Sequence, residues 1–166
     1  PAIKGVQVGI WWYELERSKG NYDFSKIDAY LNKLKSLPTA KRLVVRLKDR
    51  RFNTTSRAHI LPDYLLSDPL YNGGVVQSRT GYVARLWEKP VMDRLIALYR
   101  AIGTRYDADD YFEGVQTGET TLGFDKPWPA GYSVTALAQQ YQRFVTAART
   151  TMPRTNLFLA TNWLGS

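Results

Sequence analysis

The sequence predicts an α/β fold in which parallel β-strands alternate with α-helices. Two observations indicate it: short runs of β-forming residues recur along the chain, and the apolar residues between these runs repeat at helical spacing. Strands that alternate with helices pair in parallel through right-handed crossovers. A doubly wound sheet and a segment of a barrel share this order, so periodicity alone leaves both open.

The first strand is predicted at residues 3–10, and a turn follows it. We expect Ser25 to cap the next helix, with Asp28 three residues later in the capping-box position. Apolar residues then repeat at helical spacing as far as Leu37, and Pro38 comes directly after the helix.

The second strand is predicted at residues 42–47, which are rich in β-forming residues. An irregular stretch of about residues 49–88 follows and contains several prolines and glycines. Loops of that length inside a compact domain are usually functional or mobile. We therefore expect a long loop between the second strand and the next helix.

Two further units complete the chain. Pro90 stands where a first-turn proline belongs and opens an apolar helix. A third strand is predicted at residues 112–117. Ser133 is expected to cap the last helix, which ends before Pro153, and the fourth strand is predicted at residues 156–160.

The length and composition are those of one globular domain, with 44% hydrophobic and 23% charged residues. A complete eight-stranded barrel usually needs about 250 residues, so the barrel interpretation makes residues 1–166 a single partial segment without a second domain. No window approaches the roughly 18 consecutive apolar residues of a membrane helix, and no membrane partner is predicted. With no cysteine and one histidine, we predict neither a disulfide nor a metal or other cofactor.

The net charge of +8 is distributed unevenly. Residues 1–83 hold 14 Lys and Arg against 7 Asp and Glu, whereas residues 84–166 hold 9 against 8. A basic stripe of this kind binds nucleic acid or acidic polysaccharide in some proteins. We favour a solvated surface because no nucleic-acid motif accompanies the charge. Within the stripe, Asp49 is the only acidic residue among Lys41, Arg42, Arg46, Lys48, Arg50, Arg51 and Arg57.

Aromatic residues and carboxylates gather where the predicted strands end. In parallel α/β folds, ligands bind at the carboxyl ends of the strands. Sugars present flat C–H faces to aromatic rings and hydroxyl groups to polar side chains, and glycoside hydrolysis requires two carboxyl groups. No glycine-rich phosphate loop follows any strand. The candidates to bind a substrate at these ends are Trp12, Glu16, Asp49, Asn162 and Trp163.

Several of these residues also have a structural interpretation. Trp11 and Trp12 point to opposite sides if both are in strand geometry, so one belongs to the core and the other to the cleft. Glu16 is equally consistent with a turn carboxylate that pairs with Arg17 or Lys19. Trp163 is equally consistent with the core and with a sugar platform.

Residues 9–28 carry a resemblance to a known group of enzymes. Their sequence, Gly-Ile-Trp-Trp-Tyr-Glu-Leu-Glu-Arg-Ser-Lys-Gly-Asn-Tyr-Asp-Phe-Ser-Lys-Ile-Asp, resembles a pattern in (β/α)8-barrel glycoside hydrolases of the large retaining clan, whose families cleave β-galactosides, β-glucans and mannans. The resemblance implies a TIM-barrel segment, with residues 3–10 as the second barrel strand and residues 156–160 as the fifth.

The resemblance also implies roles for particular residues. The clan's general acid/base is a Glu at the end of the fourth barrel strand, and Glu119 stands there, preceded by Gly118 where the clan usually has Asn. The clan's nucleophile follows the seventh strand, which lies beyond residue 166. A carbohydrate substrate is implied, and so is a secreted or periplasmic location, although the chain as given carries no signal peptide.

Three functions stay open at this point. The first is a glycoside hydrolase present as a fragment of its barrel, and the second is a non-catalytic carbohydrate-binding relative. The third is a basic α/β module that binds nucleic acid or an acidic polymer. A partial barrel leaves two sheet edges unpaired, so we expect the rest of the barrel or self-association to cover them. The apolar residues expected to be exposed are Val6, Val8, Val44, Val115 and Leu157.

Overall fold

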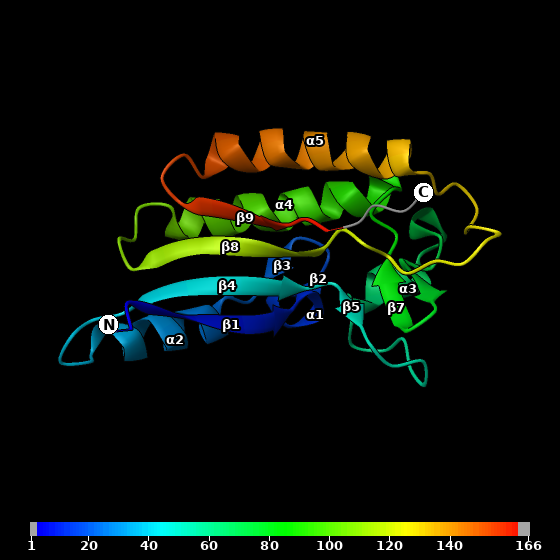
Figure 1. Ribbon diagram of the computed structural model, residues 1–166. Helices are drawn as coiled ribbons and strands as arrows, with labels where there is room; N and C mark the ends of the chain where they lie inside the picture. The colour runs from blue at the N-terminus through cyan, green and yellow to red at the C-terminus, as the bar shows by residue number, and fades with distance from the viewer. Residues whose placement is uncertain (1–2, 163–166) are drawn as a thin grey trace.

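The computed structural model describes residues 3–162, which form a four-stranded parallel sheet with helices on one face (Figure 1). The sheet has the order β1-β4-β8-β9, so its strands follow one another in chain order. Their bounds are Gly5–Trp11, Arg42–Lys48, Phe112–Glu119 and Asn156–Ala160. The predicted alternation of parallel strands and helices is confirmed. A doubly wound sheet would have helices on both faces.

Three helices connect these strands and bury one face of the sheet. They are α2 (Ser25–Lys35), α4 (Lys89–Tyr106) and α5 (Val134–Thr151). Pro90 lies in the first turn of α4, and Ser133 caps α5 by accepting a hydrogen bond from the backbone N–H of Ala136. Both of these sequence predictions are confirmed.

The start of α2 differs from the expectation. The helix begins at Ser25 itself, and the Asp23 carboxylate accepts hydrogen bonds from the Ser25 backbone N–H at 3.0 Å and hydroxyl at 2.6 Å. Asp28 forms no capping box, because its carboxylate pairs with Arg105 and Tyr106 of α4 at 2.6 and 2.7 Å. The Asp28 side chain thus connects α2 to α4 and does not cap its own helix.

Alternate residues of the strands separate the two faces of the sheet. On β4, Leu43, Val45 and Leu47 are buried under the helices, whereas Arg46 and Lys48 point to the open face. Val115 pairs with Val45 and is completely buried, so the expectation that it is exposed was wrong. The other four expected residues are partly or largely accessible, with Val6 the most exposed of them.

The stretch expected to be a long loop is a folded subdomain. It contains a three-stranded antiparallel sheet, β5-β7-β6, which lies beyond the carboxyl ends of the main strands (Figure 1). Its sequence signal was weak because these strands have two to four residues each and glycines at their ends. The bounds are β5 (Arg50–Arg51), α3 (Asp63–Ser67), η1 (Pro69–Tyr71), β6 (Val75–Ser78) and β7 (Gly81–Ala84).

A short connection follows β1 and brings the chain back to α2. It consists of α1 (Trp12–Leu15) and the small hairpin β2 (Glu16–Ser18) and β3 (Asn21–Tyr22). No helix within residues 3–162 is long and apolar enough to cross a membrane.

Candidate active site at the carboxyl ends of the strands

Glu119 is the last residue of β8, and an irregularity in strand pairing sets its direction. Gln116 and Glu119 are three residues apart, so regular alternation would point them to opposite faces. The pairing of β8 with β9 shifts register between these two residues, and Glu119 therefore shares the open face with Arg46. The Glu119 carboxylate lies 3.7 Å from the Arg46 guanidinium, and 40% of its side chain is exposed.

Asn162 connects Glu119 to the end of the neighbouring strand. Its amide nitrogen donates to the Glu119 carboxylate at 3.5 Å, and its amide oxygen accepts from the Thr121 backbone N–H at 2.7 Å. The Thr120 hydroxyl lies 3.1 Å from the same amide oxygen. The structure thus brings together two of the residues that the sequence singled out.

Arg50 fixes the backbone on which Glu119 stands. The guanidinium of this buried arginine donates to the carbonyl oxygens of Glu119 and Thr121. Charged donors form stronger hydrogen bonds than neutral ones. The turn after β8 is therefore held from the side of β5.

The Asp49 side chain is buried next to this turn and is not exposed on the open face of the sheet. Its side chain is 5% exposed, and its nearest charged partner is the Arg50 Nε at 3.7 Å. Burial raises the pKa of the Asp49 carboxyl, although the charge of Arg50 opposes that shift. One carboxylate oxygen has no hydrogen-bond partner among the described residues. Asp49 was predicted to bind substrate, but its carboxylate is buried and is not accessible from the open face.

Gly118 is explained by the position of Asp49. A Cβ atom at residue 118 would lie 2.3 Å from an Asp49 carboxylate oxygen, which is far inside van der Waals contact. The carboxylate therefore occupies the space into which a side chain at residue 118 would point. This is a physical reason for the absence of an asparagine next to Glu119.

A pocket of about 200 Å³ opens beside Glu119, between the main sheet and the small antiparallel sheet. Within residues 3–162, Glu119 is the only carboxylate that lines it. Phe52, which is 66% exposed, contributes an aromatic ring. Its polar lining residues include Arg50, Arg51, Arg79, Glu119 and Asn162.

The tryptophan at the open face is Trp11. Its ring is partly exposed and lies under the Lys48 ammonium at 4.7 Å and the Arg51 guanidinium at 5.3 Å. Trp12 has no exposed surface, because α1 begins there and turns the side chain into the core. The two tryptophans divide between the core and the open face, and Trp12, which was predicted to bind substrate, is the one in the core.

Glu16 is also part of the interior. It has no exposed surface, and it accepts hydrogen bonds at 2.9 Å from Trp12 Nε1 and from the Tyr64 hydroxyl, and a further one from the Arg94 guanidinium. All of its partners belong to the fold, so Glu16 does not reach the open face. Trp163 lies outside the described residues.

Sequence reasoning assigned no role to Arg46, Arg50 or Phe52. A signal for Arg46 was present: it alternates with three apolar residues of β4 that face the helices, so it had to point to the opposite face. The roles of Arg50 and Phe52 depend on the small sheet, which the sequence did not reveal. No group of three or more His, Asp or Glu residues within residues 3–162 could hold a metal ion.

No family model matches this sequence, and no curated protein matches it. Solved structures do match the fold. GH5_18 from Streptomyces cattleya, in complex with Manβ1-4GlcNAc, superposes with a TM-score of 0.66 at 12% identity, over 94% of this chain and 35% of that one. Endo-glycoceramidase II from Rhodococcus sp., in a cellobiose-like isofagomine complex, gives 0.64 at 15% identity, over 94% and 41%.

A third similar structure, GH5_18 from Bifidobacterium longum, has a TM-score of 0.63 at 10% identity, over 94% of this chain and 34% of that one. The chain thus spans between 34% and 41% of the length of these proteins. Identities this low show the fold alone. The predicted fold, a partial (β/α)8 barrel like that of retaining-clan glycoside hydrolases, is confirmed.

Proposed function

We propose that this chain belongs to a glycoside hydrolase and that Glu119 is its general acid/base. The observation that carries the proposal is the position of Glu119 at the carboxyl end of a parallel strand, half exposed and lining a pocket with an aromatic ring and an amide. Catalytic residues of (β/α)8 barrels come from this end of the strands. The matching solved structures with bound sugars support a carbohydrate as the substrate.

In this mechanism Glu119 first donates a proton to the glycosidic oxygen as the bond to the sugar breaks. In a retaining enzyme the second carboxylate bonds to the sugar as the leaving group departs, and Glu119 then takes a proton from the water that hydrolyses this intermediate. In an inverting enzyme the second carboxylate takes the proton from the water. The amide of Asn162 and the guanidinium of Arg46 orient its two carboxylate oxygens. The second carboxyl group would come from another part of the complete barrel, about 5–5.5 Å away in a retaining enzyme and about 6.5–9.5 Å away in an inverting one.

A second function is favoured by one observation. Gly118 stands where the retaining clan usually has Asn, and Asp49 fills the adjacent space. An enzyme that lost this contact to the sugar could persist as a carbohydrate-binding protein. The two functions differ in whether cleavage depends on Glu119.

The test is Glu119→Gln in the complete protein. This change keeps the shape of the side chain and removes the proton. Cleavage of natural oligosaccharides should fall by about 10²–10⁴-fold, the usual contribution of general acid catalysis. Aryl glycosides with activated leaving groups should lose much less, because their departing oxygen needs no proton. Steady-state kinetics on both substrate types measures the difference.

The matched control is Glu113→Gln, at the opposite end of the same strand. Glu113 pairs with Arg42 at 2.6 Å on the surface, so the variant should keep the rate within about twofold. If Glu119→Gln also keeps the wild-type rate, Glu119 is structural and the acid is another residue. If the wild-type protein binds sugars and cleaves none, the second function holds.

We propose further that the next strand–helix unit of a complete barrel covers the open edge at β9. An apolar groove of about 430 Å³ runs along this edge between α5 and β9, with Tyr141, Val145 and Leu159 in its lining. An unpaired edge beside an apolar groove favours association. The isolated 166-residue chain should therefore self-associate in light scattering, whereas the complete protein should not. A monomeric isolated chain with a cooperative, high-temperature melt would contradict this.

A further inference from the structure

The rim of the pocket beside Glu119 carries positive charge that the described residues do not neutralise. Within residues 3–162, no carboxylate pairs with Lys48 or Arg51. The guanidinium of Arg51 lies over Trp11 and donates one long hydrogen bond, of 3.3 Å, to the carbonyl oxygen of His59. Lys48 lies over the same ring, although it is not among the residues that line the pocket. Neither cation has a carboxylate partner among the described residues, so both remain available to a ligand.

Arg79 adds a third cation to this rim. It stands in the turn between β6 and β7, lines the same pocket as Arg51, and has Asp125 as its partner at 3.7 Å. The two side chains of that pair are 66% and 71% exposed. An ion pair so exposed contributes little, so an anionic ligand can replace Asp125 at small cost.

These arginines belong to the small sheet and not to the main one. Arg51 lies on β5 and Arg79 follows β6, so both stand above the carboxyl ends of the main strands. Arg46 differs, because it lies on the open face and pairs with Glu119. Arg50 differs as well, since it is buried and holds two carbonyl oxygens. The free charge is therefore concentrated on the side of the pocket that faces Glu119 from the small sheet.

We propose that this pocket binds a saccharide unit that carries an anionic group, a carboxylate or a sulfate, and that Arg51 and Arg79 bind that group. The proposal rests on the proposed function and names its substrate class. Guanidinium groups bind carboxylate and sulfate oxygens in pairs, which gives direction as well as affinity. A pocket of about 200 Å³ is smaller than the roughly 300–1,000 Å³ of sites for drug-sized ligands, so it suits one ring of a longer chain.

The rest of the pocket is consistent with a charged ring. Phe52 in the lining offers aromatic surface, and so does Trp11, which lies against Arg51 outside the lining. Asn162 offers an amide beside the acid. Among the described residues, Glu119 is the only carboxylate in the lining, so an anionic sugar meets one negative group, an arginine without an ionic partner and a second arginine whose ion pair is exposed. A neutral sugar would leave Arg51 without an ionic partner among the described residues.

The test uses the complete protein on a glycan array that carries neutral, uronate-bearing and sulfated oligosaccharides. We expect retention of charged glycans, and the uronate and sulfate arms identify which anion is bound. Titration calorimetry with the best retained glycan then compares the wild type with Arg51→Gln, Arg79→Gln and the double variant. The double variant should bind at least tenfold more weakly. Arg79 is exposed, so its variant tests the idea even if Arg51→Gln disturbs the packing on Trp11.

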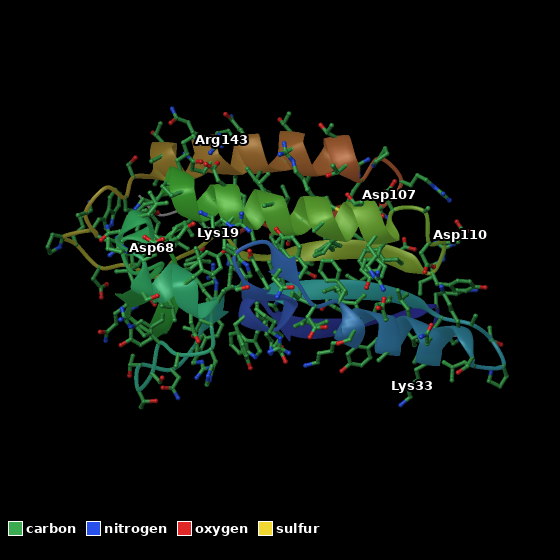
Figure 2. All side chains as sticks on the ribbon, turned by 180° about the vertical axis from the view of Figure 1, so that it is seen from behind. Lys19, Lys33, Asp68, Asp107, Asp110 and Arg143 are labelled. Carbon is green, nitrogen blue, oxygen red and sulfur yellow. The ribbon has the colours of Figure 1, made fainter. Side chains whose placement is uncertain are left out.

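The control is Lys33→Gln, which removes one charge from α2 at the opposite end of the molecule from Asp68 and the small sheet (Figure 2). It should bind within twofold of the wild type. Retention of neutral glycans alone, or charged-glycan binding that is unchanged in the double variant, would overturn the inference and leave the proposed hydrolase intact. Retention of an oligonucleotide and of no glycan would overturn both. If Glu119→Gln keeps its rate while charged glycans bind through the two arginines, only the proposed acid fails.

Discussion

Glu16 and Asp49 are both buried carboxylates near the carboxyl ends of neighbouring strands, but their surroundings differ. Glu16 accepts hydrogen bonds at 2.9 Å from the Trp12 indole, the Gly20 backbone N–H and the Tyr64 hydroxyl, and it pairs with a guanidinium as well. Every one of these groups belongs to the fold. Buried charge is tolerated when partners of this kind satisfy it.

Asp49 has far fewer partners. Its nearest charged neighbour is Arg50 at 3.7 Å, and one of its oxygens accepts no hydrogen bond from the described residues. The Tyr141 hydroxyl nearby is also buried and has no hydrogen bond to any of residues 3–162. Burial and the charge of Asp49 raise the pKa of Tyr141. The difference teaches that the fully hydrogen-bonded carboxylate Glu16 anchors the fold, whereas the incompletely hydrogen-bonded Asp49 lies next to the strand end that carries Glu119. Departures from local rules of stability concentrate at functional sites.

The largest expected effect is that of Glu16→Gln. The change leaves the Arg94 guanidinium without its carboxylate in a site where only 15% of the side chain is exposed. Breaking a buried ion pair costs about 3–5 kcal/mol, and urea denaturation of the complete protein measures the loss. The exposed pair of Glu113 and Arg42 is the reference, and its loss should cost about 0–1 kcal/mol. If Glu16→Gln and Glu113→Gln lower the free energy of unfolding equally, Glu16 is no more important for stability than a surface carboxylate.

The second effect is that of Gly118→Ala. The new methyl group would meet an Asp49 carboxylate oxygen at 2.3 Å, so either the carboxylate or the strand end must move. Overpacking of this kind costs about 1–3 kcal/mol. In an Asp49→Ala background the same change should cost clearly less, since neighbouring sites are not additive. Denaturation of the four proteins of this double-mutant cycle measures the coupling, and strict additivity would show that Asp49 does not occupy that space.

The smallest effect is the pH dependence contributed by Asp49. Burial raises the pKa of its folded state above the unfolded value of about 3.9, so folding favours the protonated form between those two pKa values. The stability of the wild type relative to Asp49→Asn should therefore rise as the pH falls from neutrality towards about 4. Denaturation midpoints at a series of pH values measure this trend.

Asp28 gives the opposite sign and serves as the control. Burial opposes the shift, but hydrogen bonds from Arg105 and Tyr106 hold the pKa of Asp28 below its ordinary value. The contribution of Asp28 to folding stability is fully present above the unfolded pKa of about 3.9. It is lost as the pH falls through the lower pKa of the folded state. The advantage of the wild type over Asp28→Asn should therefore shrink in acid. If stability relative to the Asn variant changes with pH in the same direction for Asp49 and Asp28, the pKa shifts of the two residues are not opposite.

The sequence by itself determined the order of the main strands and helices. Each of those elements carries a local period, two for strands and 3.6 for helices, and that period is readable without knowledge of the partner. The same reasoning placed Glu119 at a strand end and Ser133 at a helix cap. The local pattern failed for the small sheet, because strands of two to four residues are too short to show a period.

Only the tertiary structure decided what the polar residues at the strand ends do. Glu16 is an anchor because Tyr64 and Arg94, 48 and 78 residues away along the chain, lie against it. Trp12 is buried because a helix starts there, and Gly118 is a glycine because Asp49, far away in sequence, fills the adjacent space. Burial and hydrogen bonding depend on contacts that no local window contains, so the division between anchoring and site residues follows from the folded chain.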